Sequence, residues 1–241
     1  MRKKGKTKGN DMNELLKNSL FFGVLLSIGS YELGIWIHKK FKLAVFNPLL
    51  LSIAAVILFL VLFRVRYETY AYGAEYLSYF LTPATVCLAV PLYEQVELLK
   101  KNVAAILAGI FAGALTSACC VLLLSVLFHL SHQEYVTLLP KSITTAIGMG
   151  VSEELGGIVT ITVAVIIITG VIGNVTAETV CRLFRIQDPL AKGIAIGSAA
   201  HAVGTAKAME MGEIEGAMSS LSIAVSGIIT VLLAPVFAQF L

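Results

Sequence analysis

The chain has 241 residues, of which 57% are hydrophobic and 14% are charged, whereas a soluble domain carries about 25% charged residues. This excess of apolar surface excludes a protein with a single water-soluble core. The four cysteines have neither the spacing of a zinc site nor that of a disulfide framework, so we interpret them as apolar packing residues.

A basic tail, residues 1–17, precedes the apolar part of the chain. Its six Lys and Arg residues oppose two acidic residues and supply most of the net charge of +3. Such a tail next to a membrane is attracted to anionic lipid, and we expect no nucleic-acid partner. The run that follows, 18–37, offers no small-residue cleavage site around Tyr31, so we expect it to stay in the mature protein as a membrane span.

Four further runs contain no Asp, Glu, Lys or Arg, and a helix across a bilayer needs roughly 20 apolar residues. Each run can therefore cross hydrocarbon without burying a charge. The four runs are residues 43–63, 102–128, 155–177 and 216–241.

Three other apolar segments, 76–93, 140–157 and 193–207, are interrupted by proline or glycine, which disfavour a regular helix. Irregular backbone at membrane depth is tolerated only where protein or a water-filled cavity satisfies it. Each segment is thus a candidate cavity wall, although any one alone also fits a simple kink or a close-packed helix interface. The interrupting residues are Pro83 and Pro91, then Pro140, then Gly197 and Gly204.

These elements predict an all-α polytopic membrane protein with about 7–8 membrane segments. An interrupted segment followed by a long span occurs twice, beginning near Tyr76 and near Pro189. We therefore predict two membrane halves, 18–130 and 131–241, that form an inverted repeat with broken or re-entrant helices, the layout that marks transporter sites. The basic clusters favour an N-terminus outside the cell, whereas the basic tail favours one inside.

Four motifs in one order resemble the LrgB/CidB family of membrane proteins, over a single domain of about residues 20–241. They are Asn47-Pro48-Leu49-Leu50, the run from Pro83 to Tyr93, Leu139-Pro140-Lys141-Ser142-Ile143-Thr144-Thr145, and the run from Gly197 to Ala206 followed by Glu215-Gly216-Ala217.

The resemblance implies two functions in the plasma membrane of bacteria. Some members are described as antiholin-like or holin-like proteins that act with a small LrgA/CidA membrane partner on murein hydrolase activity and lysis. Others, including the plastid glycolate/glycerate translocator, resemble carriers of short organic acids such as pyruvate or glycolate. The family is also distantly similar to inverted-repeat secondary carriers.

Lys141 is the first candidate binding residue, because it places a positive charge beside the hydroxyls of Ser142, Thr144 and Thr145. A carboxylate would find a counter-ion and hydrogen-bond donors there. The alternative is a lysine that extends to the membrane interface.

His201 is the second candidate, because it lies in a charge-free segment between Gly197 and Gly204. Its ordinary pKa near 6.5 suits proton coupling, and the alternative is a neutral core histidine. Glu153 and Glu154 are further proton-coupling candidates. As neighbours on a helix they point about 100° apart, so they do not form a catalytic carboxylate pair, and a solvated pair is the alternative.

Polar residues beside proline or glycine complete the predicted substrate site, although each also fits a helix–helix hydrogen bond. They are Asn47, Thr82, Thr85 and Thr205.

No motif for phosphate binding, metal hydrolysis or nucleophilic catalysis occurs. We therefore expect a carrier for a small monocarboxylate, without enzymatic activity, cofactor or metal. The expected partners are the carboxylate, an LrgA/CidA-like protein and further copies of the chain. The alternative is a holin-like regulator of lysis.

Overall fold

A computed structural model describes residues 19, 21–41, 48–80, 83, 86–87 and 89–241. Every regular element in this part of the chain is a helix, which confirms the predicted all-α class. Three helices are long and apolar enough to cross a membrane, Val103–Leu127, Val159–Leu183 and Glu213–Phe240. The total of 7–8 segments and the inverted repeat remain predictions.

The chain divides into two compact units, Met1–Val86 and Cys87–Leu241, which are described separately. In the first unit, α2 (Phe22–Phe41) packs against both α3 (Pro48–Phe63) and α4 (Tyr67–Ser78). Close packing depends on Gly34, where a Cβ would lie 2.6 Å from the Pro48 carbonyl oxygen. The apolar helix α3 has 16 residues and is shorter than the three long helices.

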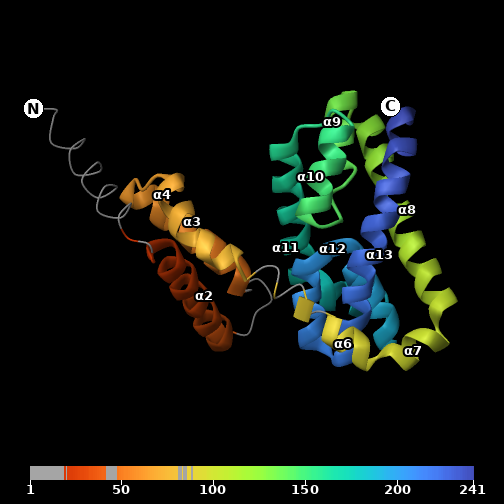
Figure 1. The fold of residues 1–241 in the computed structure, drawn as a ribbon, viewed down its shortest axis with the longest axis horizontal. Helices are drawn as coiled ribbons and strands as arrows, with labels where there is room; N and C mark the ends of the chain where they lie inside the picture. The colour runs from red at the N-terminus through yellow and green to blue at the C-terminus, as the bar shows by residue number, and fades with distance from the viewer. Residues whose placement is uncertain (1–18, 20, 42–47, 81–82, 84–85, 88) are drawn as a thin grey trace, which may run out of the picture. The chain divides into compact units, whose positions relative to one another are not determined.

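The second unit contains the candidate site. Its helices, in chain order, are α6 (Ala89–Glu94), α7 (Val96–Lys101), α8 (Val103–Leu127), α9 (His132–Leu138), α10 (Thr145–Glu154), α11 (Val159–Leu183), α12 (Pro189–Met211), α13 (Glu213–Phe237) and the short η2 (Ala238–Phe240). Figure 1 shows α9 and α10 at one end of this unit and α12 toward the other.

The helices α9 and α10 form a hairpin that turns back inside the unit. Pro140 lies beside Gly148, where a Cβ would be 3.5 Å from the Pro140 carbonyl oxygen. Farther from the turn, the Gln133 side chain donates to the Gly156 carbonyl at 3.4 Å. The chain thus enters along α9, reverses over residues 139–144, here called the first tip, and returns along α10.

Two caps fix the arms of this hairpin. Ser131 and Glu134 form a reciprocal capping box at the start of α9. The backbone N–H of Ser131, followed by its hydroxyl, lowers the pKa of the Glu134 carboxyl. Thr144 accepts the backbone N–H of Ile147 at 3.4 Å and begins α10, so this predicted site residue has a structural role.

The helix α12 is interrupted at Ala200 and His201, where His201 has a left-handed φ of 41°. This interruption at Ala200 and His201 is here called the second tip. The part of α12 before it, its first arm, runs antiparallel to α11. At its start, Lys192 shares a pocket with Cys181 near the end of α11. At its end, Ala200 packs directly against Gly173 of α11.

The arm of α12 after the second tip runs back along α11. The Asn174 side chain donates to the Val203 carbonyl at 2.7 Å. Farther along, Lys207 forms an ion pair with Glu178 at 2.7 Å. Residues 189–199 and 202–211 are therefore the two arms of a second hairpin, and its tip reaches the middle of α11. The interruption predicted for 193–207 falls at Ala200 and His201, while Gly197 and Gly204 serve close packing.

The first arm of α12 packs directly on α13. A Cβ at Gly193 would lie 2.5 Å from the Glu215 carbonyl oxygen, and one at Gly197 would lie 2.8 Å from the Ser219 Cα. Small residues four positions apart permit such close helix contact.

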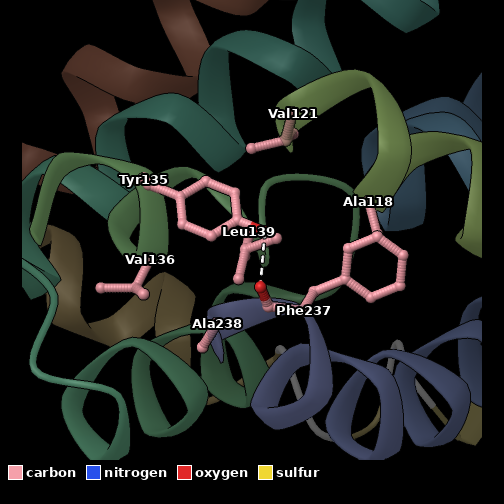
Figure 2. Close-up of a cluster of buried hydrophobic side chains, with 7 residues drawn as sticks. All are labelled: Ala118, Val121, Tyr135, Val136, Leu139, Phe237 and Ala238. Carbon is pink, nitrogen blue, oxygen red and sulfur yellow. Dashed lines mark hydrogen bonds between the residues drawn. The ribbon is translucent and has the colours of Figure 1, made fainter. Parts of the chain in front are cut away.

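An apolar cluster fills the end of the unit occupied by α9 and α10 (Figure 2). It joins α8, α9 and the end of α13 through Ala118, Val121, Tyr135, Val136, Leu139, Phe237 and Ala238. The Tyr135 hydroxyl is buried and donates to the Phe237 carbonyl at 2.9 Å.

Substitution of Tyr135 by phenylalanine is expected to destabilise this end. It removes the hydroxyl donor and leaves the Phe237 carbonyl without that partner, which costs about 1–3 kcal/mol. Thermal unfolding of purified protein in detergent measures the loss. Substitution of exposed Tyr93 by phenylalanine is the control, and an equal effect of both would contradict the prediction.

Candidate functional site

The first tip and the first arm of α12 meet at a small chamber, which Ser142 and Ser198 both line. Its volume is about 10 Å³, which is close to the smallest space that holds one water molecule. Four elements line it, namely α8, the first tip, α12 and α13. Five hydroxyl-bearing residues face it, Ser117, Ser142, Ser198, Ser226 and Thr230, here called the hydroxyl chamber.

These hydroxyls lie close to the middle of the long helices, because Ser117 and Ser226 are near the centres of α8 and α13. At the first tip, Lys141 Nζ donates to Ser142 Oγ at 2.9 Å. Ser142 Oγ and Ser117 Oγ share a hydrogen bond of 3.1 Å. The lysine charge is therefore linked directly to the chamber.

Ser198 differs from the other hydroxyls. It is 5% exposed, and within the part of the chain that the structure describes its Oγ has no hydrogen-bond partner. A buried polar atom without a partner is costly. A ligand atom or a water molecule in the chamber would satisfy it.

A groove of about 700 Å³ leads to the chamber. It runs between α8 and the first arm of α12, from Ala105 and Ala191 to Lys141, and nearly half of the residues that line it are Ala or Gly. Ser117, Ser142 and Ser198 line both the groove and the chamber. The groove thus reaches Ser117, near the middle of α8, from the end of the unit where Ala105 and Ala191 lie.

The structure brings Lys141 and Ser142 together at this site. Thr145 begins α10 behind Thr144 and does not line the chamber or the groove. Glu153 and Glu154 are exposed at the end of α10, away from both cavities.

His201 and Thr205 face other neighbours. His201 Nε2 lies 2.9 Å from the Ile166 carbonyl oxygen of α11. Thr205 Oγ1 donates to the His201 carbonyl at 3.0 Å and shares a bond of 2.7 Å with Ser219. These contacts fasten the second tip to α11 and α13. Neither residue lines the groove that contains Lys141.

Six further predicted residues are considered by their place in the chain. Asn47, Thr82 and Thr85 lie outside the described residues, and Pro83 belongs to the first unit. Pro91 lies in the short helix α6, whereas Pro140 lies in the first tip.

Four residues of the hydroxyl chamber were not predicted from the sequence, namely Ser117, Ser198, Ser226 and Thr230. The available signal was their position near the middle of charge-free runs, where a hydroxyl has no water to bond. Serine also bonds to the preceding turn of its own helix, as Ser222 does to Met218, so the signal is weak.

Comparison with known proteins identifies the family. Residues 27–240 match the LrgB-like family. The antiholin-like protein LrgB of Bacillus subtilis (strain 168) is 38% identical over 224 residues, which cover 92% of this chain and 97% of that protein. The chain belongs to the LrgB-like family. The antiholin-like protein LrgB of Bacillus cereus (strain B4264) is 37% identical, with 92% and 96% coverage.

The resemblance found in the sequence is thereby confirmed, and this LrgB-like chain is a membrane protein with membrane-spanning helices. The name that the curated relatives carry agrees with the antiholin-like interpretation. No solved structure matches this LrgB-like chain.

Proposed function

We propose that this LrgB-like protein is a permease for small monocarboxylates such as pyruvate or glycolate, rather than an enzyme. It would cross the bacterial plasma membrane several times and act with a small LrgA/CidA-like partner. The observation that carries the proposal is the position of Lys141. It lies beside the hydroxyl chamber, at the end of a groove that reaches the middle of α8.

Lys141 lies where a charge costs free energy. A charge in the middle of a membrane protein is expensive and marks a functional pathway by default. Lys141 has hydroxyl neighbours, and among the described residues that line the groove and the chamber none is acidic. An anionic ligand would supply the missing counter-charge.

Helix geometry supports the same proposal. The helix α8 is followed by a hairpin that enters from one end, and α11 is followed by a hairpin that enters from the other. We propose that these are the two units of an inverted repeat. Each unit is shorter than the repeat that was predicted from the matching segments 76–128 and 189–241. Interrupted helices at matching places in two repeats typically form a carrier's substrate site.

Transport measurements test the proposal. Proteoliposomes that contain the purified protein, with and without an LrgA/CidA-like partner, are expected to accumulate radiolabelled pyruvate or glycolate faster than empty liposomes do. Absence of uptake with both substrates, in the presence of the partner, would contradict the permease function.

The second candidate is an antiholin-like regulator of murein hydrolase activity, which the names of the relatives favour. Its test is lysis of cells that express the chain, together with hydrolase activity on gels. If Lys141 and Ser198 substitutions changed lysis but left uptake at the parent rate, the regulator would replace the permease.

His201 is proposed as a proton-coupling residue of this permease. Its Nε2 can donate to the Ile166 carbonyl in both protonation states, so a proton would be gained at Nδ1. Substitution of His201 by glutamine keeps a donor but cannot change charge. Uptake by this variant should vary less with pH, measured from about pH 5.5 to 8 around the ordinary histidine pKa. An unchanged pH profile would exclude His201 as the coupling residue.

A further inference from the structure

We infer that Ser198 determines specificity by donating a hydrogen bond to one carboxylate oxygen of the substrate, and that Gly113 keeps this hydroxyl within reach of the groove. The inference rests on the proposed function and adds the residues that recognise the anion.

A count of hydroxyl hydrogens supports an acceptor in the chamber. Lys141 donates to Ser142, and one hydrogen serves the bond between Ser117 and Ser142. The other hydroxyl hydrogen of this serine pair remains free to be donated. The Ser198 hydroxyl carries a further hydrogen that has no acceptor among the described residues. A carboxylate oxygen accepts two such bonds and donates none. An ammonium group would instead lie beside Lys141 and be repelled.

The size of the chamber defines how the substrate lies. A space of about 10 Å³ admits one oxygen-sized atom and excludes a whole carboxylate. The rest of the substrate must then occupy the groove, whose wall near Ser198 is formed by small residues such as Gly113 and Ala195. One oxygen in the chamber and a short apolar chain in the groove describe a small monocarboxylate.

Gly113 controls access to Ser198. A Cβ at Gly113 would lie 3.1 Å from the Ser198 Cβ and 3.6 Å from its Oγ. Alanine at this position would therefore cover the hydroxyl from the groove side. The nearest atom is the Ser198 Cβ, whose position the backbone sets, so α8 and the first arm of α12 would move apart by a few tenths of an ångström.

The test is equilibrium binding of radiolabelled pyruvate to the purified protein in detergent, with neutral pyruvamide as competitor. Ser198→Ala and Gly113→Ala should each weaken pyruvate binding by about tenfold, the loss expected for one hydrogen bond to a charged group. Pyruvamide should not compete, because its amide lacks the charge.

Ser125→Ala is the matched control, because Ser125 is the other buried serine without a partner among the described residues, and it lines neither cavity. It should bind pyruvate like the parent. Ser198→Ala and Ser125→Ala should keep the parent's elution volume and thermal midpoint, because alanine removes an unsatisfied hydroxyl.

Equal pyruvate binding by Ser198→Ala and the parent would overturn the inference. If uptake persists in that case, the proposed permease function still stands. Equal losses in Ser125→Ala and Ser198→Ala would also overturn the inference. Failure of the parent to bind or transport pyruvate and glycolate would remove the proposed function as well.

Discussion

Replacement of Lys141 by methionine is expected to reduce pyruvate binding and uptake by at least about 30-fold. The variant keeps an unbranched chain of similar length and removes the positive charge that faces the anion. Truncation of one partner of a desolvated charge pair costs roughly 2–5 kcal/mol. Initial uptake rates and equilibrium binding, measured on the same preparations, check this result.

Lys101→Met is the control, since Lys101 is exposed at the end of α7 and lines neither cavity. Lys141→Arg should retain part of the binding. Parent-like uptake by Lys141→Met would remove the lysine from the transport mechanism.

Replacement of Gly197 by alanine is expected to destabilise the protein strongly. The added methyl group would collide with the Ser219 carbonyl oxygen and lie 2.8 Å from the Ser222 Cβ. Since a backbone atom blocks it, the arm of α12 must move away from α13. Overpacking of this kind costs about 3 kcal/mol, or roughly 6 to 12 °C in the thermal midpoint.

Gly150→Ala provides the contrasting control on α10. No atom lies within 4 Å of the added methyl group, and alanine favours a helix by roughly 0.5–1 kcal/mol. Thermal unfolding in detergent should show no loss for this variant. Similar midpoints for Gly197→Ala and the parent would show that α12 and α13 are not packed as closely as described.

The long helices were predictable from the sequence, because the absence of charge over a membrane thickness is a one-dimensional signal. The runs 102–128, 155–177 and 216–241 correspond to α8, α11 and α13. The boundary of α11 differs, since it begins at Val159 and continues past Glu178 to Leu183. These last turns can carry charge because Lys207 neutralises Glu178.

The site was only partly predictable. Proline and glycine indicated where helices are interrupted, but a kink and a reversal produce the same sequence pattern. Only contacts such as Asn174 with Val203 distinguish them. Lys141 was found because its charge is conspicuous, whereas Ser198 depends on three-dimensional packing against Gly113. His201 was noted because it lies in a charge-free segment between two glycines, whereas the bond of its ring to α11 depends on the fold.

The hairpin of α12 also constrains how the chain enters a membrane during biosynthesis. Each arm is roughly 15 Å long at 1.5 Å per residue, about half the thickness of the hydrocarbon layer. The His201 ring at its tip bonds to Ile166 of α11, and Thr205 in the arm after the tip bonds to Ser219 of α13. Since neither arm can span lipid alone, α12 reaches its place only together with the helices before and after it.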